Sequence, residues 1–227
     1  MVCRLMTKVL IIAAHMDDEV LGCGGTITRH VRAGDRVTVC IVCKRAYNHQ
    51  FVPGLVEEER AAAKKAAQIL GYEDIRFLDL RDELLDERLL DVIVPLEECV
   101  DDLKPSVVYT HHRGDCNQDH QAVFRASLVA CRVFSKHKVR RFLCYEVPSS
   151  TEIAPPFPEY AFQPNYYVNI QEWLDVKVEA LRAYSRELRE FPHPRSAKGI
   201  RALAEKRGME IGLPAAEAFM LMRDEWA

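Results

Sequence analysis

Two short segments of the chain gather side chains that bind metals or transfer protons. Residues 15–19 are His-Met-Asp-Asp-Glu, and residues 111–120 begin with His-His and end with Asp-His. One aspartate and two histidines with an open fourth position match the ligand set of a catalytic zinc site. The spacing therefore predicts a metal site formed by His15, Asp18 and His120.

Asp17 would lie beside such a metal without being a ligand, where a carboxylate can act as the general base for an attacking water. Each segment also has a simpler explanation. The carboxylates at 17–19 would be favourable in the first turn of any helix because of the helix dipole, and His111 and His112 could be polar residues at the end of a strand. We favour the metal site because the surrounding elements are expected to bring both segments to one edge of a sheet.

Apolar runs of strand length alternate with stretches of helical pattern. This order predicts an α/β fold with a mostly parallel sheet and helices on both of its faces. In such a sheet, ligands bind beyond the carboxyl ends of the strands, which is where both segments are expected. The expected strands are 8–14, 37–43, 75–80, 106–110 and 142–147, and the expected helices are 18–33, 57–70, 89–103 and 119–135.

The alternation stops at Pro148. The stretch 148–164 contains five prolines and is expected to be a loop, followed by a candidate edge strand over 166–170. A helix is expected over 173–188, with Trp173 in its core-facing side. No repeat or linker separates these parts, so we expect residues 1–227 to form a single domain.

Composition excludes several classes of protein. The chain has 31 Lys and Arg against 34 Asp and Glu, for a formal charge of −3, which excludes a broadly basic nucleic-acid binder. No apolar run approaches the roughly 20 residues that span a bilayer, and no signal-peptide pattern opens the chain. The eight cysteines are scattered through the sequence, which favours reduced thiols and a cytoplasmic protein.

Two local motifs favour packing over chemistry. Cys40 and Cys43 form a C-x-x-C pair inside an apolar run, and no second pair follows to complete a zinc ribbon. The glycines at 22, 24 and 25 do not match a phosphate-binding fingerprint. We expect them to let a helix approach the sheet closely.

Residues 14–26 resemble the signature of the LmbE-like/PIG-L N-deacetylase superfamily, A-H-P-D-D-E followed by L-G-x-G-G-T. Further similar segments are 59–60 with Ala66 and 70–71, 109–120, 191–196 and 216–219. The resemblance implies a Rossmann-like three-layer fold and hydrolysis of the acetamide of an N-acetylated sugar or sugar conjugate, dependent on Zn²⁺ or another divalent transition metal. It implies the same metal ligands, His15, Asp18 and His120, and the same base, Asp17.

The chain departs from that pattern at two positions. Met16 replaces the usual proline, which removes a residue that fixes the backbone at a helix start. Asn117 replaces a histidine that assists the reacting carbonyl in many members, so Asn117 is expected to contact the substrate. The assisting role is then open to His112 or to His193, which two prolines flank, with His111 as a further candidate.

Arg60 is a second candidate for substrate binding, because a guanidinium near the binding edge can hold a sugar hydroxyl or a phosphate. Two alternatives to a sugar deacetylase stay open. One is a metal-dependent amidase that cleaves a non-sugar or thiol-conjugate amide, and the other is a non-catalytic Rossmann-like binding domain. The expected partner is a small N-acetylated sugar, and the resemblance allows a homo-oligomer.

Overall fold

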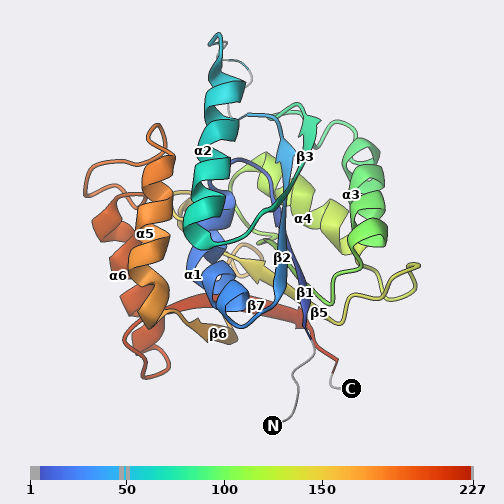
Figure 1. Ribbon diagram of the computed structural model, residues 1–227. Helices are drawn as coiled ribbons and strands as arrows, with labels where there is room; N and C mark the ends of the chain where they lie inside the picture. Colours follow the sequence, from blue (N-terminus) through green and yellow to red (C-terminus); the bar gives the residue numbers. More distant parts are fainter. Residues whose placement is uncertain (1–5, 46–48, 50–51, 226–227) are drawn as a thin grey trace.

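A computed structural model of the chain describes residues 6–45, 49 and 52–225. Strands and helices alternate along most of it (Figure 1). The strands are β1 Lys8–Ala13, β2 Arg36–Cys43, β3 Asp74–Leu80, β4 Val107–His111, β5 Arg141–Tyr145, β6 Tyr166–Asn169 and β7 Ala216–Arg223. The helices are α1 Asp18–Arg32, α2 Leu55–Leu70, α3 Leu90–Leu103, α4 Gln118–Ala130, α5 Leu174–Ala183 and α6 Ala197–Met209.

All seven of these strands join one sheet in the order β3-β2-β1-β4-β5-β7-β6. The first five in this order run parallel, and β7 runs antiparallel to both β5 and β6. The predicted mostly parallel sheet is thus confirmed, including an edge strand after the proline-rich loop. The strand order reverses direction between β1 and β4, and ligands bind at such a switch point in open α/β sheets.

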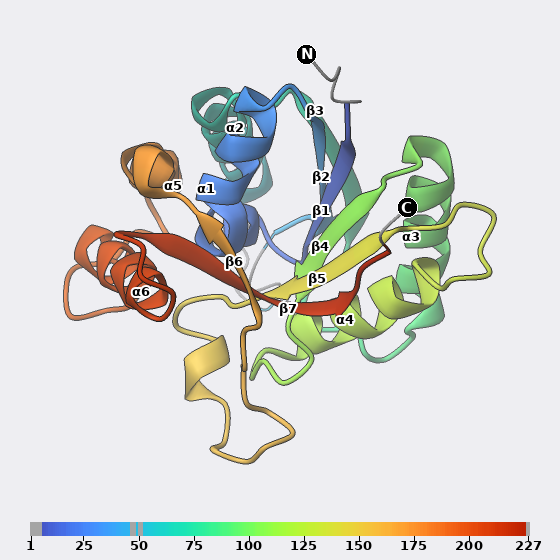
Figure 2. The ribbon, with the colours of Figure 1, turned by 90° about the horizontal axis from the view of Figure 1, so that it is seen from below.

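Helices cover both faces of the sheet, which makes a three-layer α/β/α architecture (Figures 1 and 2). Apolar residues of α1, α2 and α5 pack on one face and those of α3 and α4 on the other. Strand β1 lies between these two cores, and its side chains alternate between them. Burial on both faces explains why its sequence is a continuous apolar run.

The glycines of α1 do allow close packing, as expected. A Cβ atom on Gly22 would lie 2.3 Å from the ring of Tyr145 in β5, and one on Gly25 would lie 2.6 Å from the Ile170 side chain. Both distances are shorter than real Cβ contacts. Any larger residue at these positions would push α1 away from the sheet and from the segment before α5.

Both partners of a buried ion pair form hydrogen bonds with the backbone of α1. The Lys177 Nζ atom lies 2.6 Å from Glu217 Oε1 and donates to the Leu21 carbonyl. The Glu217 carboxylate accepts hydrogen bonds from the backbone N–H groups of Gly25 and Thr26, at 2.9 and 2.7 Å. In a regular helix, the Gly25 N–H would pair with the Leu21 carbonyl. The ion pair therefore ties α1 to α5 and β7 through these backbone groups.

Several expectations for the second half of the chain were wrong. Strand β7 and helix α6 were not anticipated, and the helices predicted over 119–135 and 173–188 end earlier, at 130 and 183. The β7 sequence, Ala-Glu-Ala-Phe-Met-Leu-Met-Arg, has few residues with high strand propensity, so its pairing with β5 and β6 determines its conformation. Trp173 is half-buried in a 3-10 turn before α5, with the Arg32 guanidinium 5.9 Å from its ring, and is not in the core.

No helix in the described part of the chain is both long and apolar enough to cross a membrane.

Candidate metal centre and active site

The first cluster of polar residues lies in the tight turn between β1 and α1. Asp17, the residue before α1, has a φ of 129°, in a region that residues other than glycine rarely adopt. Such strain costs on the order of 1–3 kcal/mol and is concentrated at functional sites. The His15 N–H donates to Asp18 Oδ2 at 2.8 Å, and the Asp17 carbonyl accepts from the N–H groups of Val20 and Leu21. The turn therefore holds three of the predicted site residues in a defined orientation.

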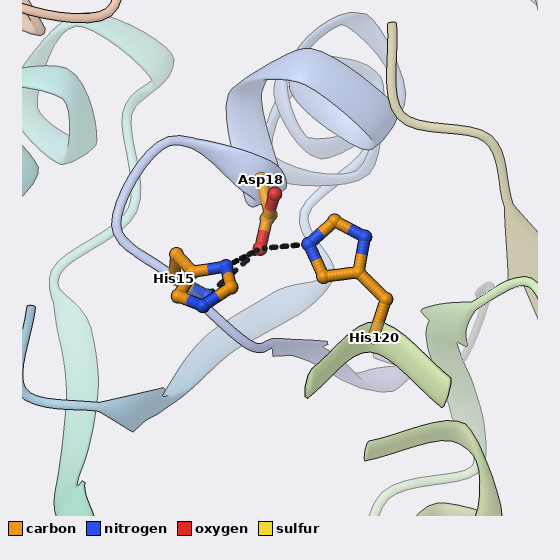
Figure 3. Close-up of side chains that lie close together, drawn as sticks. All are labelled: His15, Asp18 and His120. Atoms are coloured by element: carbon orange, nitrogen blue, oxygen red, sulfur yellow. Dashed lines mark hydrogen bonds and ion pairs between the residues drawn. The ribbon is translucent and has the colours of Figure 1, made fainter. Parts of the chain in front are cut away.

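The predicted metal ligands converge in the folded chain. Asp18 Oδ2 lies 3.4 Å from His15 Nδ1 and 3.4 Å from His120 Nε2, although His120 comes from α4 (Figure 3). One ligand atom from each of the three residues lies within 4.8 Å of the other two, and all three residues are buried. Asp18 Oδ1 is buried without a hydrogen-bond partner. A buried carboxylate oxygen with no partner fits a cation, which would satisfy it.

Each candidate histidine ligand has a carboxylate behind it. His15 Nε2 lies 3.0 Å from Asp119 Oδ2, and His120 Nδ1 lies 3.1 Å from Asp115 Oδ1. Asp115 is itself held by the Thr151 hydroxyl at 2.6 Å. Metal-ligating histidines are usually supported in this way, because the carboxylate fixes the ring orientation and increases ligand basicity. The donor set and its support therefore fit Zn²⁺.

The electrostatics of the cluster favour positive charge. Burial opposes the charged form of His120, but the Asp18 and Asp115 carboxylates outweigh it and raise the pKa of His120 to about 9. Burial likewise opposes a charged His15, yet Asp119 and Asp18 raise its pKa well above the usual value. Burial disfavours the Asp18 carboxylate, whereas His120 and His111 lower its pKa well below the usual range. A divalent cation would take the place of the protons that these groups attract.

Asp17 lies beside the cluster and is held by Arg195. The Arg195 Nη1 atom is 2.9 Å from Asp17 Oδ2 and 2.8 Å from Glu187 Oε2, and its Nε donates to Ser149 Oγ. Asp17 is only 3% exposed, and burial raises its pKa well above the usual value although Arg195 acts in the opposite direction. Sequence reasoning did not select Arg195, because only the fold brings the loop before α6 to the start of α1.

A cavity of about 390 Å³ opens over the cluster, a volume within the range of small-molecule sites. His15, Asp17, Asp119 and His120 line it together with Asn117. Residues of α2 and of the segment after α5 form further walls, among them Glu58, Glu59, Lys65, Tyr184, Arg186 and Glu187. Glu59 belongs to one of the segments that resemble the superfamily, but it was not selected as a site residue, because the pattern of its helix is also that of an ordinary charged surface helix.

Asn117 has two roles in this geometry. It is the N-cap of α4, where its Oδ1 accepts from the N–H groups of Asp119 at 2.8 Å and His120 at 3.3 Å. Since Oδ1 serves as the cap, the Nδ2 group is the remaining polar end of this cavity-lining side chain. Asn117 therefore positions His120 and also offers a neutral N–H donor near the candidate metal ligands.

The other predicted site histidines are placed differently. His111 is buried against the cluster, where its ring stacks on His120 at 4.0 Å and its Nε2 accepts from the Ala14 N–H. His112 Nε2 lies 3.0 Å from the Tyr160 carbonyl, and His193 Nδ1 accepts from the N–H of Arg195. None of these histidines is among the described residues that line the cavity.

Arg60 is also outside the described cavity lining. Its guanidinium pairs with Asp79 and lies 4.6 Å from the centre of the Phe77 ring. The neighbouring Glu59 faces the cavity instead. The structure thus brings Asn117 and the four residues at 15, 17, 18 and 120 together, and it places His112, His193 and Arg60 elsewhere.

The fold and the site together define a Rossmann-like enzyme with a candidate metal centre at the switch point of its sheet. Residues 10–131, more than half of the chain, match the PIG-L family, described as GlcNAc-PI de-N-acetylase. The chain therefore belongs to the PIG-L family of deacetylases, which are hydrolases of carbon–nitrogen bonds other than peptide bonds. The predicted superfamily membership is confirmed.

Individual relatives agree with this assignment. The "Uncharacterized deacetylase YaiS" of Escherichia coli (strain K12) is 30% identical over 78% of this chain and 89% of its own length. The "Probable N-acetyl-alpha-D-glucosaminyl L-malate deacetylase 2" of Bacillus subtilis (strain 168) is 30% identical over 78% of this chain and 81% of its own. The solved structure of N,N'-diacetylchitobiose deacetylase from Pyrococcus horikoshii matches with a TM-score of 0.78 at 20% identity, over 95% of this chain and 84% of that one, which shows a shared fold.

Proposed function

We propose that this protein is a zinc-dependent deacetylase that hydrolyses the acetamide of an N-acetylated sugar or sugar conjugate to acetate and a free amine. The observation that carries the proposal is the position of Asp17. Its carboxylate lies next to the His15, Asp18 and His120 cluster and lines the same cavity. A base beside a metal site is the arrangement that water attack on an amide requires.

Asp17 moves the proton in the proposed reaction. Arg195 binds its Oδ2, which leaves Oδ1 to accept a proton from the attacking water. The water oxygen bonds to the acetyl carbon, the carbon–nitrogen bond breaks, and Asp17 returns the proton to the leaving amine nitrogen. Acetate and the amine are the only products, and the carboxylate ends in its starting state.

His15, Asp18 and His120 would hold Zn²⁺, which when bound polarises the acetamide carbonyl and lowers the pKa of a water. Asn117 stands where many members of the family have a histidine that assists the reacting carbonyl, and its side-chain amide supplies a neutral hydrogen-bond donor in that place. Its Nδ2 group can hydrogen-bond the carbonyl oxygen as negative charge develops on it. Asp119 and Asp115 keep the two imidazole rings oriented.

The substrate assignment is supported by the names of relatives and by the cavity walls. The names of two curated relatives specify an N-acetylglucosaminyl conjugate and diacetylchitobiose. Carboxylates and amides such as Glu58, Glu59 and Asn117 suit the hydroxyl groups of a sugar.

The described cysteines are free thiols, five of the seven buried, which agrees with a reducing cytoplasm.

The test is an amine-release assay on N-acetylated sugars and on non-sugar amides with zinc-loaded protein. Asp17→Asn is expected to bind zinc as the wild type does and to lose about 10²–10⁴ in rate, because it removes the general base. Zinc content is measured on the same samples. Wild-type activity in Asp17→Asn would show that Asp17 is not the base, and cleavage of only non-sugar amides would refute the sugar assignment.

A further inference from the structure

Cys43, the second cysteine of the C-x-x-C pair, lies beside the candidate metal centre. Cys43 is the last residue of β2, and the register with β3 shifts between Ile41 and Cys43, where β3 carries one extra residue. The Cys43 N–H donates to the Ala14 carbonyl, which ties the end of β2 to the residue before His15. The two cysteines do not act as a pair, because Cys40 contacts Cys99 whereas Cys43 contacts the His15 ring.

This contact completes a second set of metal-ligating atoms. One ligand atom each from His15, Cys43 and Asp119 lies within 4.8 Å of the other two, and all three residues are buried. Asp119 is 1% exposed, and its Oδ1 has no hydrogen-bond partner. A buried thiol, an imidazole nitrogen and an unsatisfied carboxylate oxygen at this spacing form a donor set for a thiophilic cation.

The His15 ring stands between the two sets. Its Nδ1 faces Asp18, 3.4 Å away, and its Nε2 faces Asp119, 3.0 Å away. Figure 3 shows the side of the ring that faces Asp18 and His120. A cation held by Nε2 would thus lie on the opposite side of the imidazole from the first site.

We propose that His15, Cys43 and Asp119 form a second, inhibitory site for a thiophilic divalent cation, represented by Cd²⁺ or by Zn²⁺ in excess. Binding there releases the Cys43 thiol proton and the proton on His15 Nε2, and the thiolate sulfur, Nε2 and an Asp119 oxygen become ligands. The cation replaces the hydrogen bond between His15 and Asp119. That bond orients His15 for the first site, so occupation of the second site lowers activity.

The site is tested by titrating Cd²⁺ into protein that holds one equivalent of Zn²⁺ and following the thiolate-to-cadmium charge-transfer absorption in the ultraviolet. Wild type is expected to develop this band with one further equivalent of cation, and Cys43→Ser is expected to lack it. Cys144→Ser is the matched control, since Cys144 is also buried and belongs to neither ligand set. Cooperative urea unfolding verifies that each variant is folded.

Two outcomes would overturn the proposal. A full band in Cys43→Ser that disappears in Cys40→Ser would place the cation at the contact between Cys40 and Cys99. A band that appears in metal-free wild type with the first equivalent, and that Cys43→Ser removes, would make this set the primary site. Neither measurement depends on enzymatic activity.

The inhibitory effect rests on the proposed deacetylase function and has its own readout. In the amine-release assay, the Cd²⁺ concentration for half inhibition is expected to rise at least about 10- to 100-fold in Cys43→Ser, because losing a ligand costs no less than losing a group that only supports a ligand. Activity with one equivalent of Zn²⁺ is expected to stay at the wild-type level. Equal sensitivity of the two proteins to Cd²⁺ would refute the inhibitory role, whereas absence of activity in both would count against the deacetylase function alone.

Discussion

Replacing Asn117 with serine should leave α4 intact while slowing the proposed reaction. The wild-type side chain accepts two backbone hydrogen bonds with Oδ1, at 2.8 and 3.3 Å, and lines the cavity beside the candidate metal ligands. Serine keeps an oxygen that can cap the helix but lacks the amide N–H donors. The substitution therefore separates the structural role of Asn117 from its chemical role.

The two effects have different expected sizes. Asparagine and serine are nearly equal as N-caps, so the free energy of unfolding should change by less than about 0.5 kcal/mol. Loss of one donor to a developing oxyanion typically lowers kcat by about 10²–10³, or about 2.7–4 kcal/mol. KM should change little, because the donor acts mainly in the transition state.

The assay measures kcat and KM of amine release together with urea unfolding for wild type, Asn117→Ser and Asn117→Ala. The alanine variant loses both roles and should unfold about 1 kcal/mol more easily than wild type. Wild-type kcat in Asn117→Ser would refute the donor role. Equal destabilisation of the two variants would refute the capping role.

Three further predictions concern stability. Lys177→Met should lower the free energy of unfolding by about 3–5 kcal/mol in a urea titration, because the buried Glu217 carboxylate loses its counter-charge; a loss below 1 kcal/mol would contradict the role of the pair. Gly22→Ala should cost about 1–3 kcal/mol by the same measurement, since its Cβ would overlap the Tyr145 ring, and an unchanged midpoint would disprove this. Burial raises the pKa of Glu59 from 4.5 to about 7, so folding favours its protonated form. Its contribution to stability is therefore full below pH 4.5 and lost as the pH rises through about 7. Unfolding midpoints at pH 5 and pH 8 should differ less in Glu59→Gln than in wild type. The same difference in both proteins would show that Glu59 does not contribute to the pH dependence of stability.

The sequence was sufficient for most of the sheet and for the central site residues. Strands buried on both faces require continuous apolar runs, so β1, β2 and β4 are visible without any structure. The potential metal ligands at 15, 18 and 120 follow two such strands, and neighbouring parallel strands have their carboxyl ends at the same edge of the sheet. That local pattern predicted which side chains would meet, and the PIG-L family match agrees with it.

The C-terminal elements could not be read in the same way. Strand β7 is weakly strand-forming and is stabilised by its neighbours β5 and β6. The sequence also could not show which of two adjacent histidines would contact the candidate metal site. His111 and His112 are adjacent in the sequence, yet one stacks on His120 and the other meets the Tyr160 carbonyl, because neighbouring residues of an extended chain point in opposite directions.

The types and local spacing of the reactive groups were thus determined by the sequence, and their long-range partners were decided by the tertiary structure. Arg195 meets Asp17 across 178 positions of the chain, and Asp119 meets His15 across 104. Cys43 contacts the same ring from the end of β2. Such contacts depend on how layers of helices and strands pack, and no periodicity within one segment encodes the distance between two side chains that are remote in the sequence.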